Sequence, residues 1–207
     1  MKANKDGWRL WPLAASALFF AATTSSTSQA SGVHSMITGG LTSQPIGHYE
    51  FCQTNSAECS IRVRDSGPMT LTDDNWKLIS RINRAVNAAV TPMSDFDIYG
   101  KEEHWAYPGQ GVGDCEDYVL EKRRQLASKG ISLSNLLITV LRKPDGEGHA
   151  VLTVRTDRGD LVLDNLNDDV KIWYKTGYQF LKRQAATHTG RWVSLREDQN
   201  MLVGAVQ

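Results

Sequence analysis

The chain has 207 residues, with 23 lysines and arginines against 23 aspartates and glutamates, so its formal net charge is zero at pH 7. This balance, with no basic block or stripe, argues against a nucleic-acid partner. The length fits a single globular domain that is large enough to bury a sizeable core.

The N-terminal segment has the parts of an export signal. A positively charged head precedes an apolar run from Leu10 to Ala22, and small residues follow at Ser28-Gln29-Ala30. We therefore predict that residues 1–30 are a signal peptide and that residues 31–207 form one mature domain. The alternative is a membrane anchor, but the apolar run is shorter than the roughly 20 residues that a span needs. We expect no stable membrane span after signal cleavage.

The three cysteines suggest one disulfide and one free thiol. Cys52 and Cys59 lie close together in a polar, turn-rich stretch, and an oxidising compartment favours a bridge between them. Cys115 is then the free thiol. Two alternatives remain open: Cys52 and Cys59 both stay reduced, or one of them pairs with Cys115. The sequence has no CxxC pair, which argues against a structural zinc site.

The first half of the mature chain predicts one long helix between two irregular segments. Residues 31–68 carry several glycines and prolines and are predicted to be irregular. A helix is predicted from Thr72 to the residues before Pro92, followed by a loop from Thr91 to Gly113. Apolar residues recur on one face of this helix at helical spacing: Trp76, Ile79, Ile82, Val86 and Val90.

The second half predicts a helix followed by antiparallel strands. The helix begins at Cys115, with Asp114 as a potential cap, and ends at Lys129 before Gly130. The predicted strands, most of them separated by turns, are Leu136–Leu141, His149–Thr156, Leu161–Asp164, Ile172–Tyr174, Tyr178–Leu181 and Trp192–Leu195. Helices followed by a meander of strands indicate an α+β domain.

The hexapeptide Gly113-Asp114-Cys115-Glu116-Asp117-Tyr118 places the free cysteine in the first turn of a helix. Unpaired N–H groups at a helix start stabilise a thiolate, so Cys115 is a candidate nucleophile. The acids on both sides should oppose the thiolate by like-charge repulsion. They need a second explanation, such as capping of the helix or binding of a cation.

Two further residues complete a candidate catalytic array. His149 opens one predicted strand and Asp164 closes the next, so an antiparallel hairpin brings them to the same edge of the sheet. Cys115 would then be the nucleophile, His149 the base and Asp164 the residue that orients the imidazole. Each residue alone has an ordinary structural reading, His149 as a packed strand residue and Asp164 as a turn former.

The ordered hexapeptide, His149 and Asp164 resemble the bacterial transglutaminase-like cysteine peptidases, whose best-known branch is the LapG-type periplasmic protease. Trp105-Ala106-Tyr107-Pro108 also resembles that family's Trp-x-x-Pro element. The resemblance covers residues 45–195. It implies a papain-like, transglutaminase-like core, with the nucleophile helix packed on an antiparallel sheet.

The resemblance also implies a calcium-dependent endopeptidase of the periplasm. Its substrate would be a large biofilm adhesin cleaved near the adhesin's N-terminus, at a di-alanine-containing site. Its regulator would be an inner-membrane receptor for cyclic di-GMP. Asp114 and Glu116 match the family's calcium-binding acids, although capping and the helix dipole could explain them equally. A calcium ion needs 6–8 oxygen ligands, so other groups must complete its shell.

Three points stay open in the sequence. The backbone N–H of Cys115 is a candidate oxyanion-hole donor, and Trp105 or Gln110 could supply a second. The same triad would also serve a transglutaminase-type acyl transferase, which differs only in the second nucleophile. An inactive binding module is the third reading, and the intact array argues against it.

Overall fold

The structure is a computed structural model that describes Met1 and residues 35–196. The predicted signal peptide therefore lies, apart from Met1, outside the described residues and remains a prediction. Within the described part, no helix combines the length and the apolar character that are needed to cross a membrane.

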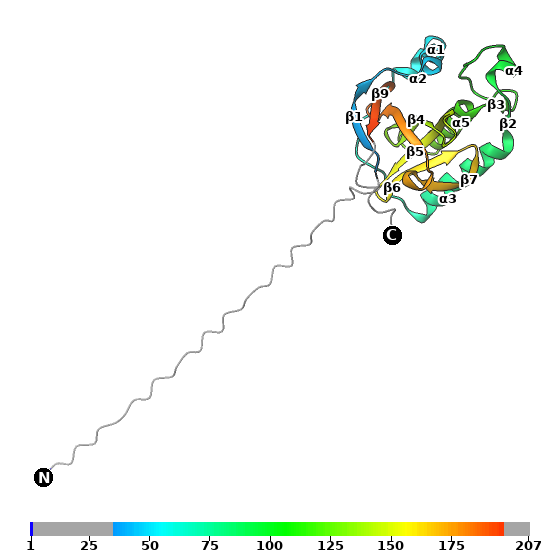
Figure 1. Cartoon of the computed structure of the whole chain (residues 1–207). Coiled ribbons are helices and arrows are strands. Elements are labelled where there is room, and N and C mark those ends of the chain that lie inside the picture. The colour runs from blue at the N-terminus through cyan, green and yellow to red at the C-terminus, as the bar shows by residue number, and fades with distance from the viewer. Residues whose placement is uncertain (2–34, 197–207) are drawn as a thin grey trace. The chain divides into compact units, whose positions relative to one another are not determined.

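A seven-stranded antiparallel sheet forms the frame of the domain, in the order β1-β9-β8-β4-β5-β6-β7 (Figure 1). The four strands β4 to β7 follow one another as the predicted meander. The chain then crosses back, because β8 pairs with the free edge of β4, and β9 and β1 extend the sheet from there. The strand bounds are β1 Ile37–Thr42, β4 Leu136–Arg142, β5 Gly148–Thr156, β6 Gly159–Asp164, β7 Asn167–Ile172, β8 Gln179–Ala185 and β9 His188–Arg196.

Five α-helices lie among the described residues: α1 Ile46–Thr54, α2 Ser56–Cys59, α3 Asp73–Ala89, α4 Asp95–Tyr99 and α5 Cys115–Ser128. Two short strands, β2 Thr91–Pro92 and β3 Val112–Gly113, form a parallel pair. The prediction that residues 31–68 are irregular is thus wrong, since they hold β1, α1 and α2. The predicted loop at 91–113 also contains β2, α4 and β3. These elements are too short to give a clear hydrophobic period.

The two long helices agree with the sequence pattern. Thr72 caps α3 by accepting a hydrogen bond from the N–H of Asn75 at 3.2 Å, and Ile79 and Val86 are buried on its inner face. Trp76, expected on that face, is instead 41% exposed. The predicted strand Ile172–Tyr174 is also wrong, because β7 ends at Ile172 and a 3-10 turn spans Trp173–Lys175.

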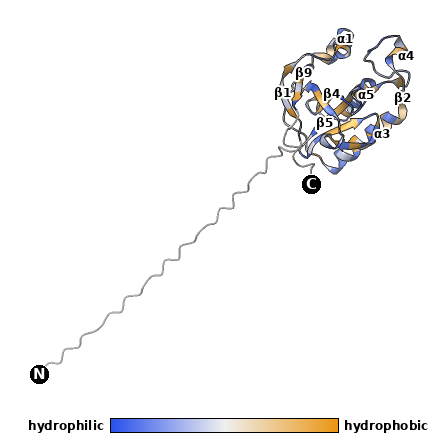
Figure 2. Cartoon of the chain, viewed as in Figure 1, coloured by the Kyte–Doolittle hydropathy of each residue, from blue (hydrophilic) through white to orange (hydrophobic). Residues whose placement is uncertain are grey.

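The sheet separates two apolar clusters. Leu152 and Val154 of β5 join the larger cluster with α3 and α5, whereas Val151 joins a smaller one with Phe180 of β8. Alternate residues of β5 therefore face opposite sides of the sheet. The hydrophobic colouring of Figure 2 falls on the central strands β4 and β5. This central region supports both α5 and the β5–β6 hairpin, the two elements that carry the predicted site.

Candidate active site

The start of α5 is held by the short strand β3. Within the β2–β3 region, the N–H of Met93 donates to the carbonyl of Gly113 at 3.0 Å. A Cβ atom on Gly113 would lie 2.6 Å from Oδ2 of Asp117, so only glycine permits this close approach. Asp114 occupies the N-cap position of α5, but its side chain makes no capping hydrogen bond. The capping role expected for Asp114 is therefore not seen. Its carboxylate is not used to cap α5 and can take part in binding a cation.

The β5–β6 hairpin brings His149 and Asp164 together. Nε2 of His149 lies 2.9 Å from Oδ1 of Asp164, and both side chains are buried. Since the carboxylate accepts this hydrogen bond, Nε2 carries the proton and Nδ1 remains the free basic nitrogen. The hairpin register, which pairs Leu152 with Leu163, produces the juxtaposition that the sequence predicted.

Tyr178 is a member of this site that the sequence analysis missed. Its hydroxyl donates to Oδ2 of Asp164 at 2.7 Å, and its ring lies edge-on to His149 with centroids 5.9 Å apart. Burial alone would raise the pKa of Asp164, but hydrogen bonds from His149, Leu166 and Tyr178 outweigh it and lower that pKa. Nothing in the sequence linked Tyr178 to Asp164, because the contact depends on the path of the chain after β7.

Cys115 and His149 line one cavity of about 390 Å³, which also includes Trp105. The indole N–H of Trp105 donates to Oε2 of Glu103 at 3.1 Å, so this donor is engaged within the protein. Gln110 is not among the residues that line the cavity. Of the two candidates for a second oxyanion donor, only Trp105 thus lies near the thiol.

The surroundings of the Cys115 thiol oppose its ionisation. Its S–H donates to Oε2 of Glu116 at 3.2 Å. Burial raises the pKa of Cys115 well above its ordinary value, and the charge of Glu116 adds to the rise, while the backbone N–H of Ala150 opposes it. Burial and the charge of Asp114 also raise the pKa of Glu116 to about 10. Burial first, and the neighbouring acids after it, therefore disfavour the thiolate of Cys115.

Three carboxylates converge beside Cys115, the candidate nucleophile. Asp95, Asp114 and Asp117 each offer an oxygen, and these oxygens lie within 4.8 Å of one another. Each residue also has one buried carboxylate oxygen without a hydrogen-bond partner, Oδ1 of Asp95 and Asp114 and Oδ2 of Asp117. Burial and the charges of Asp114 and Asp95 raise the pKa of Asp117 to about 7. Buried, unpartnered carboxylate oxygens are the donors that a hard divalent cation prefers, so the cluster fits calcium.

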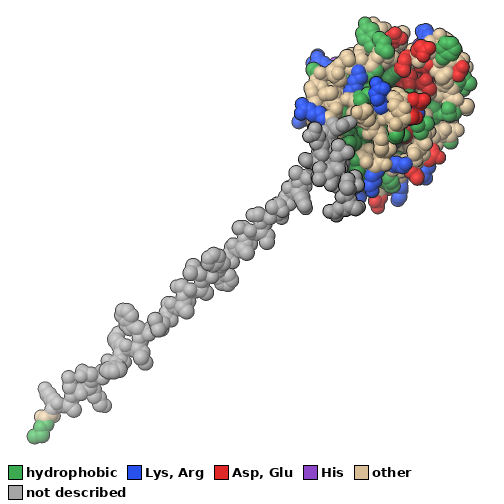
Figure 3. All heavy atoms as spheres, viewed as in Figure 1, with side chains coloured by type: hydrophobic (Ala, Val, Ile, Leu, Met, Phe, Trp, Pro, Cys, Tyr) green, Lys and Arg blue, Asp and Glu red, His purple; other side chains and the backbone are tan. Residues whose placement is uncertain are grey.

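The composition of this acid cluster differs from the predicted calcium pair. Asp114 belongs to it, and Asp117 of the same hexapeptide joins it. Asp95 comes from α4 and was missed, because the sequence gives no sign that α4 folds against the start of α5. Glu116 is not a member of the group. Figure 3 shows acidic side chains gathered on the upper part of the visible face, between the regions that Figure 1 labels α1 and α4.

Cys52 and Cys59 form a disulfide with an S–S distance of 2.03 Å, and Cys115 is free. The bridge closes α1 and α2 into one unit. Within α1, a Cβ atom on Gly47 would lie 2.4 Å from the Trp105 ring, which shows how closely α1 packs against that wall of the cavity. The disulfide unit therefore supports the wall of the candidate active site.

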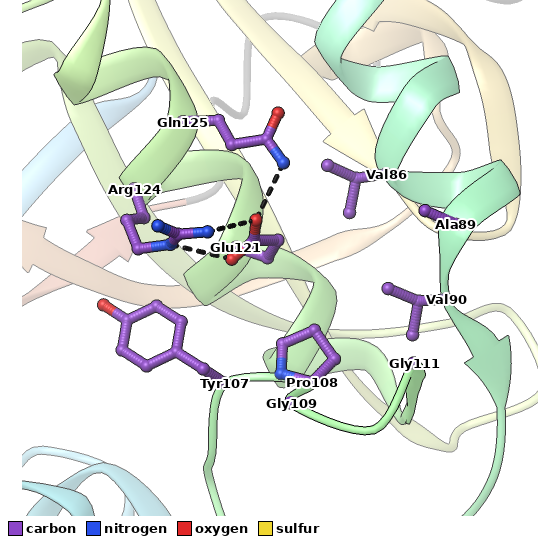
Figure 4. A pocket seen from close by; sticks show the side chains of 10 residues that line it. All are labelled: Val86, Ala89, Val90, Tyr107, Pro108, Gly109, Gly111, Glu121, Arg124 and Gln125. Carbon is purple, nitrogen blue, oxygen red and sulfur yellow. Dashed lines mark hydrogen bonds and ion pairs between the residues drawn. The ribbon is translucent and has the colours of Figure 1, made fainter.

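A second cavity of about 400 Å³ lies between α3, α5 and the loop at 107–111 (Figure 4). Arg124 and Gln125 both donate to Glu121 in this cavity, and Val86 projects into it from α3. None of its lining residues is a cysteine or a histidine. This cavity is therefore separate from Cys115 and His149.

A cysteine at a helix start, packed beside a sheet that carries a histidine–carboxylate pair, is the arrangement of papain-like thiol hydrolases. The family model described as bacterial transglutaminase-like cysteine proteinase (BTLCP) matches residues 38–200. The protein belongs to this family and is a cysteine peptidase, as the sequence predicted.

Two solved structures show the same fold. Legionella pneumophila LapG is 23% identical, with a TM-score of 0.50 over 61% of this chain and 71% of that chain. Calcium-bound Legionella pneumophila LapG is 21% identical, with a TM-score of 0.50 over 60% of this chain and 72% of that chain. A search of curated proteins returned no match. The structural matches confirm the predicted transglutaminase-like α+β core.

Proposed function

We propose that this cysteine peptidase is a calcium-dependent endopeptidase that uses Cys115, His149 and Asp164 to cleave an exported protein. The observation that carries the triad is the buried 2.9 Å contact between His149 and Asp164, in a hairpin whose histidine shares a cavity with the free thiol. The predicted signal peptide, residues 1–30, would deliver the enzyme to the periplasm, where the Cys52–Cys59 bridge is stable.

The proposed reaction gives each of these groups one role. Nδ1 of His149 takes the thiol proton, and Sγ of Cys115 bonds to the scissile carbonyl carbon. The carbon–nitrogen bond then breaks, and the imidazolium proton passes to the leaving amine. Water, activated by the same imidazole, releases the acyl group and restores the thiol. Asp164 holds the ring in the tautomer that these steps need, and the N–H of Cys115 is the proposed oxyanion donor.

Calcium would be held by Asp95, Asp114 and Asp117, with Glu116 as the further ligand that the sequence suggested. A bound divalent cation would supply positive charge that neutralises these acids. The three unpartnered carboxylate oxygens support this site. The calcium-bound form of Legionella pneumophila LapG, a protein of the same fold, adds support.

For the substrate, we propose a large surface adhesin with a di-alanine segment near its N-terminus. For the regulator, we propose an inner-membrane receptor that sequesters the peptidase when cyclic di-GMP is abundant. Both follow from the resemblance of the hexapeptide and the triad to the LapG-type branch. A gene for a very large repeat-rich exported protein beside the gene for this chain would support the substrate.

The decisive experiment separates cleavage from acyl transfer. The purified mature protein is incubated with a di-alanine adhesin fragment, with and without a labelled amine, in the presence of calcium. New N-termini in the fragment are expected from the wild type and not from Cys115→Ala. Incorporation of the amine without cleavage would show that the protein is an acyl transferase and not a peptidase. Identical behaviour of wild type and Cys115→Ala in every assay would leave only a binding role.

A further inference from the structure

Two asparagines interrupt the apolar inner face of α3. Asn83 and Asn87 lie one helical turn apart, next to Ile82 and Val86, and Asn83 is fully buried. Asparagine is a poor residue for a helix interior, and a buried amide costs free energy unless it is hydrogen bonded. The partners of these two amides therefore indicate why α3 carries them.

Both amides donate to the turn that follows Asp164, the acid of the proposed triad. Nδ2 of Asn87 donates to the carbonyl of Asp164 at 3.0 Å and to Oδ1 of Asp168 at 2.9 Å. Nδ2 of Asn83 donates to the carbonyls of Asn167 and Asp168, at 2.9 and 3.0 Å. These partners are all carbonyl or carboxylate oxygens, so the chemistry fixes which end of each amide faces the turn. Side chains of α3 thus hold the backbone of Asp164 and of the residues just beyond it.

The turn between β6 and β7 lacks the backbone geometry that supports a tight hairpin. Its two residues, Asn165 and Leu166, connect Asp164 to its strand partner Asn167, and neither has a positive φ. A short hairpin fits the twist of its strands best when a turn residue, or a residue directly after the turn, has a positive φ. The β5–β6 hairpin meets this condition through Gly159, with a φ of 114°, whereas Asn167 at the corresponding place does not. The β6–β7 turn therefore needs support from outside the hairpin, and the two asparagines supply it.

The position of this turn matters to the candidate active site. Oδ1 of Asp164 lies 2.9 Å from Nε2 of His149 and also accepts from the N–H of Leu166 at 3.0 Å. Asn165 lines a cavity of about 520 Å³ that also includes Cys115. A shift of the turn would therefore move the carboxylate away from the imidazole.

We propose that Asn83 and Asn87 are positioning residues of the cysteine peptidase, which hold the β6–β7 turn on α3 and thereby fix Asp164 beside His149. This inference rests on the proposed triad. Both asparagines act through Asp164 and not on the reacting atoms. Asn87 is the more direct of the two, because it binds the carbonyl of Asp164 itself.

The kinetic test replaces Asn87 and compares it with another asparagine of the same helix. Asn87→Leu keeps the branched shape and removes the donors, and Asn87→Asp replaces the donors by a carboxylate. Asn75→Leu and Asn75→Asp are matched controls, because Asn75 is exposed and donates to the carbonyl of Thr70. With calcium and the di-alanine adhesin fragment, kcat of both Asn87 variants should fall about tenfold while KM is unchanged. Both Asn75 variants should match the wild type.

A second readout needs no substrate. The nitrogen NMR signals of the His149 ring, assigned with His149→Gln, report which ring nitrogen carries the proton. The wild type and the Asn75 variants should carry it on Nε2, because the Asp164 carboxylate accepts from that atom. The Asn87 variants should show a mixture of both tautomers. Asn87→Ser, which withdraws the donor without adding bulk or charge, should show the same mixture if neither larger change permits folding.

The outcomes separate this inference from the proposed function. If the wild type cleaves and the Asn87 variants keep both its kcat and its Nε2 tautomer, the positioning role is overturned and the peptidase function stands. Lower melting temperatures with the wild-type tautomer would likewise overturn it, since Asn87 would then only stabilise the fold. If the wild type does not cleave the fragment but the Asn87 variants change the tautomer, the positioning of Asp164 stands and the proposed substrate fails.

Discussion

The hydroxyl of Tyr178 donates to Oδ2 of Asp164 at 2.7 Å, while Oδ1 of the same carboxylate faces His149 at 2.9 Å. Each oxygen of the candidate triad acid is thereby held by a different side chain. The carboxylate cannot turn without breaking one of these bonds, so Tyr178 helps to fix the plane in which His149 is held. We therefore expect Tyr178 to act as a positioning residue in the proposed triad.

The first prediction concerns Tyr178→Phe, which removes this hydroxyl and leaves the ring. We expect the free energy of unfolding at neutral pH to fall by about 2 kcal/mol, because a hydrogen bond to a buried carboxylate is lost. The bond lowers the pKa of Asp164, so the deficit should be complete above the ordinary pKa of aspartate and shrink as Asp164 takes up a proton at acid pH. Urea denaturation at several pH values measures this. A deficit that is independent of pH would show that Tyr178 only packs.

The second prediction concerns the acid cluster and uses two aspartates of the same short helix. Calcium at a hundred times its dissociation constant should raise the free energy of unfolding by about 2.7 kcal/mol. Asp95→Asn should lose most of this gain. Asp97→Asn should keep it, because Asp97 is exposed and outside the cluster. Calorimetry with calcium and with chelator compares the variants.

Glu116→Gln provides a separate answer on the sequence prediction. If calcium raises the free energy of unfolding of Glu116→Gln as much as that of the wild type, Glu116 is not a ligand. If this stabilisation by calcium is lost in Glu116→Gln, Glu116 is a ligand alongside Asp114. If calcium stabilised Asp95→Asn and the wild type equally, the cluster of three aspartates would not be the calcium site.

The third prediction concerns the glycine before the nucleophile helix. In Gly113→Ala the new methyl group would meet Oδ2 of Asp117 at 2.6 Å and its Cβ at 2.8 Å. We expect a loss of about 2 kcal/mol of stability from this overpacking, together with weaker calcium binding, since Asp117 must move. Gly40→Ala is the matched control, because no atom lies within 4 Å of the added Cβ. Equal melting temperatures for the two variants would contradict the expectation.

The fourth prediction concerns Lys122, a fully buried lysine of α5 whose ammonium lies 5.8 Å from the ring centre of Tyr118. Burial lowers its pKa from 10.5 to about 7, although the charges of Asp164 and Asp168 oppose this. Between these pH values the unfolded chain holds a proton that the folded chain releases, so stability should rise with pH. Lys122→Met should lack this rise and be more stable at pH 7 by about 2 kcal/mol.

Denaturation at pH 7 and pH 9.5 tests this for the wild type and Lys122→Met. Lys129→Met, at the exposed end of the same helix, should follow the wild type at both pH values. The stability of the wild type could instead rise no more than that of Lys122→Met between pH 7 and pH 9.5. Lys122 would then not be the group that releases a proton on folding.

The fifth prediction concerns the disulfide. The bridge between Cys52 and Cys59 spans a sequence separation of 7. The entropy of so small a loop corresponds to about 2.5 kcal/mol of stability, which the double variant Cys52→Ser, Cys59→Ser should lose. Because α1 packs against Trp105, KM for a cleaved peptide should rise in the same variant. A lower melting temperature with an unchanged KM would mean that the wall of the cavity is independent of the bridge.

The sequence predicted the elements that are long or sharply marked. The apolar spacing along α3, the turns around β5 and β6, and Cys115 at a helix start all depend on local patterns, and the structure has each of them. The contact between His149 and Asp164 was predictable because a tight hairpin fixes its own register. What local patterns could not reveal is how distant segments meet. Asp95 and Tyr178 reach the site from α4 and from the chain beyond β7, and neither stands in a motif.

The unit closed by the Cys52–Cys59 bridge bears on how the wall of the cavity is assembled. His48, inside this unit, lies within hydrogen-bond distance of Trp192 and Gln184 and packs edge-on against Trp105. The Trp105 wall of the cavity that contains Cys115 and His149 thus depends on the Cys52–Cys59 disulfide. A reducing compartment does not maintain such a bond. In a newly made chain this wall of the cavity would be loosely held until the Cys52–Cys59 disulfide forms. Under the proposed export to the periplasm, oxidation there would set the point at which this wall becomes firm.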